Sequence, residues 1–168
     1  MNHLHLRLWS PDDVPLLRAA NSPEMTAHLN GPESDHQLTE RHERYLRLNA
    51  TDEARMFVIV DEDGHPLGSI GYWPIEWRGE AAWETGWFVL PDAQGQGVAS
   101  QALGLLIDDA RSHPAGPRPL VAFPGVDNPA SNGVCRRRGF TLAGTVTEQF
   151  RGSTLAVNEW VLELASTP

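Results

Sequence analysis

A glycine-rich turn stands between an apolar run and a helical pattern in VLPDAQGQGVASQAL, from Val89 to Leu103. The first backbone N–H groups of a helix have no partner within it, and the helix dipole adds partial positive charge there. The turn therefore indicates an anion site, and a phosphate suits it. The residues that would bind the anion are Gln94, Gly95, Gln96, Gly97, Val98, Ala99 and Ser100. In the simpler alternative, which the turn alone leaves open, Gly95 and Gly97 only supply unusual backbone dihedrals.

Two common nucleotide-binding motifs fit this turn poorly. A P-loop needs a lysine in GxxxxGK[ST], and the chain contains no lysine. A Rossmann fingerprint would read Gly95-x-Gly97-x-x-Gly, but Ser100 replaces its third glycine. The next expected strand, residues 119–123, also lacks a closing acidic residue. A nicotinamide-dependent oxidoreductase is therefore a weak alternative.

A third pattern matches in two places. Gln94-x-x-Gly97-x-Ala99 has the form [Q/R]-x-x-G-x-[G/A], and downstream stands NPASNGVCRRRGF, from Asn128 to Phe140. These stretches resemble the acetyl-CoA motif and the following block of the GNAT superfamily of N-acetyltransferases, and within it the group that acetylates the N-termini of ribosomal proteins. The resemblance covers nearly the whole chain. It implies an acetyl-CoA-dependent N-acetyltransferase that acts on a primary amine of a small molecule or a protein N-terminus, and it is vague about the acceptor.

The resemblance also implies how acetyl-CoA is held as co-substrate. In relatives a backbone N–H at the end of the strand before the turn faces the thioester carbonyl, which gives this role to Val89 or Leu90. Asn128 would bind the pantetheine amides with its paired donor and acceptor; the alternative is a turn-forming Asn-Pro pair. No metal is expected, because the seven histidines form no HExxH motif or Cys/His cluster.

Acetyl transfer needs a base for the amine, a donor for the oxyanion and a proton for the leaving thiolate. Glu84 is the first candidate base, because it lies in the same expected strand shortly before the thioester; an exposed strand carboxylate is the alternative. Many relatives carry a tyrosine acid at the position of Cys135, so Ser131 becomes the candidate acid, with helix capping as its alternative. The resemblance implies direct attack without an acyl-enzyme, which leaves Cys135 as a buried thiol. Glu148 is a reserve base, since the base of the ribosomal-protein group would fall nearer Phe150.

Aromatic and basic side chains gather near the same segments. Four tryptophans crowd two neighbouring strands, namely Trp73, Trp77, Trp83 and Trp87. Some belong in the core, and one or two could line an acceptor pocket whose aromatic and acidic character suits a cationic amine. Three arginines, Arg136, Arg137 and Arg138, could neutralise coenzyme phosphates, although a solvated helix face is expected for at least two of them.

The elements that must position these residues follow from apolar periodicity. Strands are expected over residues 3–9, 56–60, 66–73, 82–90, 119–123, 140–150 and 155–164, and helices over 12–20 with Asp12 as cap, 37–49, 99–110 and 128–138. Three strands before the turn form an antiparallel meander, joined to a strand–helix–strand unit. Alternation places Glu84, Gly86 and Phe88 on one face unless a bulge reverses the phase. The expected fold class is α/β (α+β), with a mixed, mainly antiparallel sheet of about six to seven strands flanked by helices.

The whole chain of 168 residues fits a single domain, residues 1–168. Its formal net charge of -9 argues against nucleic acid or an anionic membrane as a partner. A cytoplasmic enzyme is expected, in agreement with a single cysteine and with no apolar run of the roughly 20 residues that span a bilayer. A homodimer is left open. A non-catalytic acyl-CoA-binding sensor is the alternative function, because Cys135 replaces the usual acid.

Overall fold

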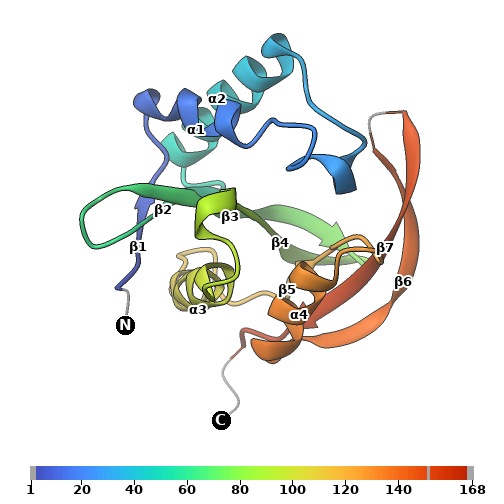
Figure 1. The fold of residues 1–168 in the computed structure, drawn as a ribbon. Coiled ribbons are helices and arrows are strands. Elements are labelled where there is room, and N and C mark those ends of the chain that lie inside the picture. Colours follow the sequence, from blue (N-terminus) through green and yellow to red (C-terminus); the bar gives the residue numbers. More distant parts are fainter. Residues whose placement is uncertain (1–2, 151, 166–168) are drawn as a thin grey trace.

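The computed structural model of the protein describes residues 3–150 and 152–165, which form a seven-stranded sheet with helices on both faces (Figure 1). The strands, in the spatial order β1-β2-β3-β4-β5-β7-β6, are β1 (His5–Leu8), β2 (Arg55–Val60), β3 (Pro66–Trp77), β4 (Glu80–Val89), β5 (Leu120–Ala122), β6 (Thr141–Phe150) and β7 (Ser153–Leu162). The α-helices are α1 (Val14–Ala19), α2 (Asp35–Ala50), α3 (Val98–Arg111) and α4 (Pro129–Arg137), and the 3-10 turns are η1 (Pro11–Asp13), η2 (Ala27–Leu29) and η3 (Pro91–Ala93). Only β4 and β5 pair in parallel among these strands, so the predicted mixed, mainly antiparallel α/β fold is confirmed.

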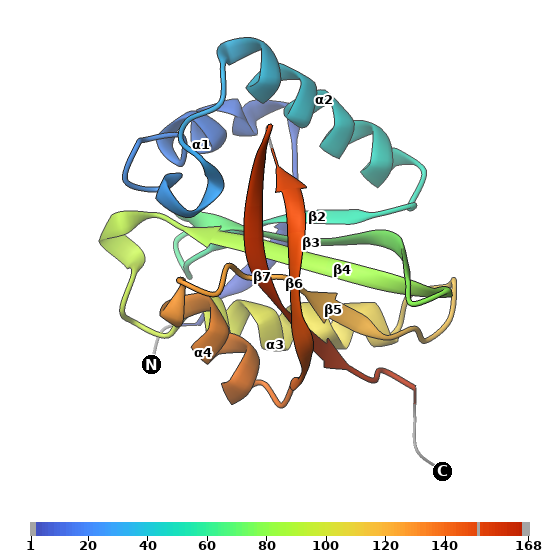
Figure 2. The same cartoon turned by 90° about the vertical axis from the view of Figure 1, so that its right-hand side faces the viewer.

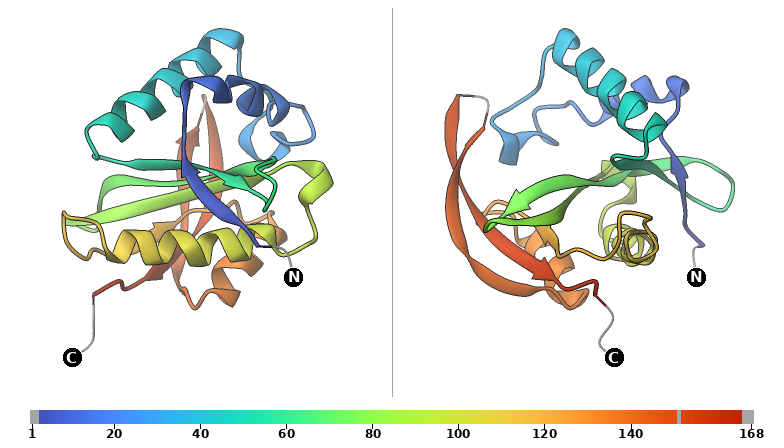
Figure 3. Two further views of the ribbon diagram at one scale, coloured as in Figure 1. Left: turned by 90° about the vertical axis from the view of Figure 1, so that its left-hand side faces the viewer. Right: turned by 180° about the vertical axis from the view of Figure 1, so that it is seen from behind.

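Two helical layers enclose the sheet. Helices α1 and α2 cover one face, and α3 lies against the other (Figures 1 and 3). Strand β2 serves both layers because its side chains alternate between the faces. Phe57 and Ile59 belong to the core beneath α3, whereas Met56, Val58 and Val60 pack beneath α1 and α2. Because both faces of β2 are buried, these five residues form an unbroken run of apolar residues in the sequence.

Strands β4 and β5 separate after a short contact. Their register pairs Trp83 with Leu120 and Glu84 with Val121. Strand β5 ends one residue later, at Ala122, while β4 continues to Val89. The sheet therefore opens beyond Glu84, at the end of β4 that leads into the glycine turn.

The β6–β7 hairpin crosses the other strands steeply and rises toward the layer of α1 and α2 (Figure 2). Strand β7 pairs with β5, and β6 forms the edge of the sheet. The β6–β7 register shifts between Leu142 and Gly144, and a bulge of this kind bends a strand. Beyond this bulge, the hairpin crosses β3 and β4 rather than running along them (Figure 2).

The predicted elements are found with small shifts of their ends, but two details are wrong. Ser10 rather than Asp12 caps the first helical segment, because Ser10 Oγ accepts the Asp12 N–H at 3.3 Å while Asp13 Oδ2 accepts the Ser10 N–H at 2.7 Å. Strand β3 also continues to Trp77 and reaches β4 at Glu80 through two residues, whereas the expected strand ended at residue 73. Within the described residues, none of the helices combines the length and the hydropathy that a membrane crossing requires.

Candidate active site

The glycine turn joins η3 to the first residue of α3 in a conformation that only glycine adopts easily. Gly95 and Gly97 have φ of 74° and 78°, in the left-handed region that costs other residues about 1–2 kcal/mol. A Cβ at either position would meet no atom within 4 Å. The backbone dihedrals therefore explain both glycines, as in the simpler interpretation, and the open space beside them leaves room for a ligand at the N-terminus of α3.

A cleft of about 640 Å³ opens at this turn. It is bounded by the end of β4, the turn, the first residues of α3 and one face of α4 from Ala130 to Arg137. Nine of the predicted cofactor-binding residues line it, namely Val89, Gln94, Gly95, Gly97, Val98, Ala99, Ser100, Asn128 and Ser131. Leu90 and Gln96 instead line a neighbouring cavity behind the turn, where the Gln96 amide donates to Asp92 O at 3.2 Å.

The β3–β4 register determines which backbone groups of β4 face the gap that opens between β4 and β5 beyond Glu84. Leu90 N–H donates to Leu67 O at 2.8 Å, so this residue pair is hydrogen-bonded and the adjacent pair, which contains Val89, is not. The N–H of Val89 thus points away from β3, as does that of Trp83, which donates to Pro119 O at 2.8 Å. Beyond the last β4–β5 pair, the Val89 amide is directed into the gap, whereas the Leu90 amide is held within the sheet.

Helix α4 brings Asn128 and Ser131 to the opposite wall of the cleft. Asn128 is the N-cap of α4, and its Oδ1 accepts the Ser131 N–H at 3.2 Å. The Asn-Pro turn expected as the alternative is therefore present, and within the described residues no partner holds the Asn128 Nδ2. Because Asn128 is the N-cap, Ser131 does not cap the helix. It lies in the first turn of α4 and lines the cleft.

Cys135 lies on the core side of α4. Its side chain is fully buried among apolar residues, and burial raises the pKa of the thiol to about 12. A thiol in this environment is neither a nucleophile nor a ready proton donor at neutral pH. The residue that replaces the tyrosine of many relatives therefore packs in the core.

Glu84 stands at the point where β4 and β5 separate. No bulge interrupts β4, so Glu84, Gly86 and Phe88 share a face as predicted. Trp73, the cross-strand partner of Glu84, hydrogen-bonds its carboxylate. Burial, reinforced by the negative charge of Glu148 and opposed by the Trp73 hydrogen bond, raises the pKa of Glu84 to about 7. A carboxylate with this pKa can take up a proton at neutral pH and release it again.

The β6–β7 hairpin supplies two further carboxylates on the same side. Burial and the charge of Glu159 raise the pKa of Glu148. Glu159 is 8% exposed and accepts hydrogen bonds from Arg78 Nη2 at 2.8 Å and from Trp77 Nε1 at 3.2 Å. The side chain of Phe150, where the base of the ribosomal-protein group was expected to fall, is outside the described part of the structure.

The four tryptophans divide between core and site. Trp83 is 1% exposed and packs edge-on against Tyr72, so it belongs to the core. Trp87 lines the cleft, and Trp73 and Trp77 hold the carboxylates of Glu84 and Glu159. Two aromatic rings therefore stand beside the acidic groups, which is an arrangement that attracts cations.

Sequence reasoning missed several side chains of the cleft. Glu24 and Met25 reach it from the segment before η2, and Met25 Sδ accepts a hydrogen bond from Gln94 Nε2 at 3.4 Å. Only tertiary packing brings this segment to the turn, so no local signal could have identified it. Of the three arginines that the sequence suggested for the coenzyme phosphates, Arg137 lines the cleft, whereas Arg138 donates to Ser100 O at 2.6 Å.

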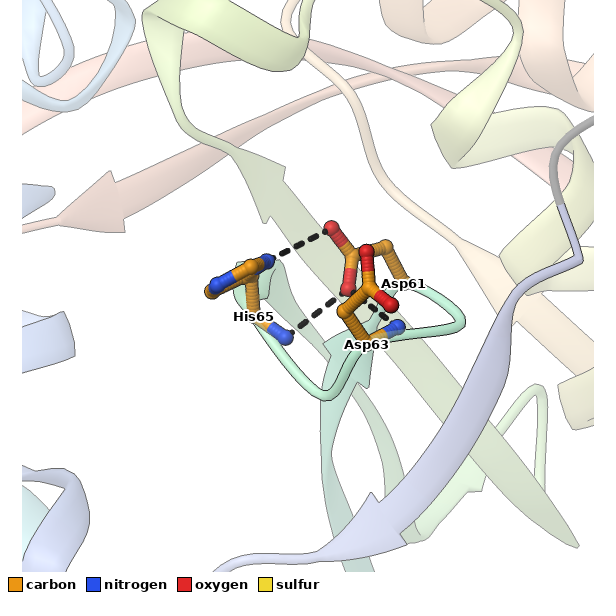
Figure 4. A group of neighbouring side chains, drawn as sticks. All are labelled: Asp61, Asp63 and His65. Atoms are coloured by element: carbon orange, nitrogen blue, oxygen red, sulfur yellow. Dashed lines mark hydrogen bonds and ion pairs between the residues drawn. The ribbon is translucent and has the colours of Figure 1, made fainter.

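A separate acidic group lies at the exposed β2–β3 turn (Figure 4). Within residues 3–150 and 152–165, Asp61, Asp63 and His65 are the one set of acidic or histidine side chains close enough together to share a cation. Asp61 Oδ1 accepts the backbone N–H groups of Asp63 and His65, each at 2.9 Å. Turn formation accounts for this arrangement.

Three comparisons with known proteins bear on this site. A model of the acetyltransferase (GNAT) domain matches residues 3–141. A ribosomal-protein-serine acetyltransferase of Escherichia coli (strain K12) is 38% identical over 104 residues, which are 61% of this chain and 56% of that protein. The match thus spans little more than half the length of this curated relative.

Solved structures extend the similarity over almost the whole chain. A ribosomal L7/L12 α-N-protein acetyltransferase in complex with coenzyme A superposes with a TM-score of 0.78 at 25% identity, covering 95% of this chain and 93% of that one. A spermidine N-acetyltransferase from Vibrio cholerae, in complex with CoA and spermine, has a TM-score of 0.78 at 19% identity and covers 96% and 95% of the two chains. At 19% identity, the similarity to the second structure establishes a shared fold and nothing about the substrate.

Proposed function

The chain belongs to the acetyltransferase (GNAT) family, and from this premise we propose that it transfers the acetyl group of acetyl-CoA directly to a primary amine. The acceptor is a small molecule or a protein N-terminus; similar proteins are named as an α-N-protein acetyltransferase and a spermidine N-acetyltransferase. One observation carries the proposal. Strands β4 and β5 separate directly after Glu84, and the cleft at the other end of the resulting gap is lined by the glycine turn, Asn128 and Ser131.

In this proposal the turn binds the diphosphate of acetyl-CoA. The backbone N–H groups of residues 95–100 would donate to the phosphate oxygens, each bond to a charged partner contributing about 1.5–3 kcal/mol, whereas the Gln94 N–H already donates to Pro91 O. The dipole of α3 would add about 0.3–1 kcal/mol. Arg137, the cationic side chain of the cleft, would supplement these donors. The pantetheine arm would then run along the free edge of β4 toward Val89, opposite Asn128.

Glu84 is proposed as the general base. A protonated amine loses a proton to the Glu84 carboxylate, directly or through water, and its lone pair forms the new C–N bond at the thioester carbonyl. The Val89 N–H, directed into the gap, would donate to the oxyanion that forms. Collapse of the tetrahedral intermediate breaks the C–S bond, and the second proton of the attacking nitrogen passes through the Ser131 hydroxyl to the leaving thiolate, which gives the N-acetylated amine and the CoA thiol. The pKa of about 7 suits Glu84 to accept a proton at neutral pH.

Ser131 is proposed as the group that hands a proton to the leaving thiolate. It carries the one hydroxyl that α4 presents to the cleft in place of a tyrosine, since Cys135 is buried in the core. Glu148 stays in reserve as a base. Its more direct effect is electrostatic, because its charge helps to raise the pKa of Glu84.

A panel of amines tests the activity. The purified protein is mixed with acetyl-CoA and each amine in turn, and release of the CoA thiol is followed. Thiol release that depends on one class of amine supports the enzyme. A protein that binds acetyl-CoA but releases no thiol with any amine would instead be an acyl-CoA sensor, the alternative that the burial of Cys135 leaves in place.

The same proposal includes a cytoplasmic location, residues 1–168 as one catalytic domain, and no nucleic-acid or membrane partner. The net charge of -9 supports the last point, because like charges repel the protein from anionic polymers and surfaces. A homodimer stays open.

A further inference from the structure

Asn132 is a buried polar side chain in α4 that neither the sequence nor the proposed mechanism assigns to a task. It is 7% exposed, and its amide makes four hydrogen bonds. Nδ2 donates to Gly125 O at 2.9 Å and to Asn128 O at 2.7 Å. Oδ1 accepts from Asn158 Nδ2 at 2.9 Å and from Trp160 Nε1 at 2.8 Å. Every donor of this amide and both lone pairs of its oxygen are therefore in use.

These four bonds join three segments that approach the cleft from different parts of the chain. Gly125 and Asn128 belong to the connection between β5 and α4, whereas Asn158 and Trp160 belong to β7. The connection lies along β7 like a short extra strand, because Asn158 N–H donates to Pro124 O at 2.9 Å and Val126 N–H donates to Ala156 O at 3.1 Å. The side chain of Asn132 thereby holds α4 against the edge that β7 and the β5–α4 connection form together.

The partners require an amide at position 132. Two of them are carbonyl oxygens, which only accept, and one is an indole N–H, which only donates. A carboxylate of the same size would set its oxygen against the two carbonyls, and an apolar side chain would leave buried groups unpaired at a cost of about 1–3 kcal/mol each.

We propose that Asn132 is a positioning residue that fixes Asn128 and Ser131 for the pantetheine arm and thiol of acetyl-CoA. It acts through the backbone of Asn128, which it binds directly, and through the first turn of α4, which carries Ser131. The inference rests on the proposed function. It concerns the pantetheine end of the cleft, because the four hydrogen bonds of the Asn132 side chain go to the β5–α4 connection and to β7 rather than to the glycine turn.

The test compares Asn132→Asp with Asn49→Asp. Asn49 is a matched control at the far side of the molecule, where its side chain likewise bridges a helix to a strand by donating to Met56 O at 3.1 Å and accepting the Met56 N–H at 2.8 Å. Affinity is measured for CoA and for 3′-phospho-ADP, which keeps the phosphates of CoA and lacks the pantetheine arm. Michaelis constants for acetyl-CoA and amine are measured on the same variants.

Asn132→Asp is expected to raise the Kd of CoA and the KM of acetyl-CoA by about 10- to 100-fold, because small misplacements of positioning groups have effects of this size. The Kd of 3′-phospho-ADP and the KM of the amine should stay within about twofold of wild type, and Asn49→Asp should change none of the four constants. Equal weakening of both nucleotides, or a CoA affinity equal to that of Asn49→Asp, would overturn the inference.

A second variant keeps the test usable if Asn132→Asp does not fold. In Asn132→Ser the hydroxyl can still donate to the carbonyl four residues earlier, that of Asn128. A smaller loss of about 3- to 10-fold, again confined to CoA, is expected; an unchanged CoA affinity would count against the inference. If the wild-type protein binds no CoA at all, the proposed function fails, and that outcome is distinct from a failure of Asn132.

Discussion

The role proposed for Glu84 as a base would come with a cost to the stability of the fold. Its pKa is raised from 4.5 in the unfolded chain to about 7 in the folded protein. The folded state therefore holds the proton more tightly, and this contribution to stability is complete below about pH 4.5 and is lost as the pH rises through about 7. At the pH where the carboxylate can act as a base, it destabilises the fold. Such a trade-off is typical of active-site groups.

Replacing Glu84 by glutamine should separate the two effects. The amide keeps the size of the side chain but cannot take a proton, so turnover at neutral pH should fall by about 10²- to 10⁴-fold. The free energy of unfolding at about pH 8 should rise by on the order of 3 kcal/mol at most, with little change at about pH 4.5. Urea unfolding at both pH values and steady-state kinetics measure the two quantities.

Glu80 provides the control on the same strand, because it is exposed and lies before the β4–β5 contact. Glu80→Gln should leave turnover and the pH dependence of stability unchanged. A Glu84→Gln protein with wild-type turnover would remove Glu84 as the base, whatever its stability.

Glu148 should act on the reaction through the pKa of Glu84. Glu148→Gln removes a negative charge that helps to hold this pKa up, so the acid limb of kcat/KM should move to lower pH while the plateau stays the same. A pH–rate profile measures the shift. A fall of the plateau itself would show that Glu148, rather than Glu84, takes the proton, and Glu62→Gln in the exposed β2–β3 turn serves as the charge control.

At the scale of single residues, the sequence predicted what alternation and local motifs determine. The face of β4 on which Glu84 lies followed from the two-residue period of a strand. Whether the Val89 or the Leu90 N–H points into the gap could not be predicted, because it depends on which pairs of the β3–β4 ladder are hydrogen-bonded. Asn132 was missed because its four partners come from segments that only the folded chain brings together.

At the scale of elements, the helix that follows the glycine turn was predicted within one residue at each end, because its apolar positions and flanking breakers are local signals. The separation of β4 from β5 was not predicted. It results from the shortness of β5 and from the pairing of β5 with β7, which are contacts between distant parts of the chain. The cleft thus depends on a feature that no window of the sequence contains.

The turn itself can be tested with a pair of matched glycines. Gly97 and Gly64 both have positive φ, 78° and 86°, with no atom within 4 Å of a Cβ. Alanine at either position should lower the free energy of unfolding by a similar amount, about 1 kcal/mol. Only Gly97→Ala should also weaken CoA binding, because its Cβ and the strained backbone disturb the proposed diphosphate site. Calorimetric titration with CoA measures the difference, and equal affinities for the two variants would contradict the anion site.

At the scale of the whole molecule, the sheet keeps two cores apart and leaves the site at their common edge. The core beneath α3 and that beneath α1 and α2 share β2 and β3. The sequence predicted the mixed sheet, since apolar runs, breakers and the order of elements are visible in it. It could not predict that the β6–β7 hairpin would cross the sheet and bring Glu148 and Glu159 to the side of Glu84.

Binding of acetyl-CoA should stabilise the molecule as a unit, because the proposed site joins β4, α3 and α4. A ligand at 100 times its Kd adds about 2.7 kcal/mol to the free energy of unfolding, which for a chain of this size raises Tm by roughly 5 to 10 °C. NAD also carries a diphosphate but lacks the pantetheine arm, so at the same concentration it should shift Tm much less. Thermal unfolding with each nucleotide measures this. A shift with NAD equal to that with acetyl-CoA would favour the oxidoreductase alternative, and the absence of any shift with acetyl-CoA would contradict a coenzyme site in the cleft.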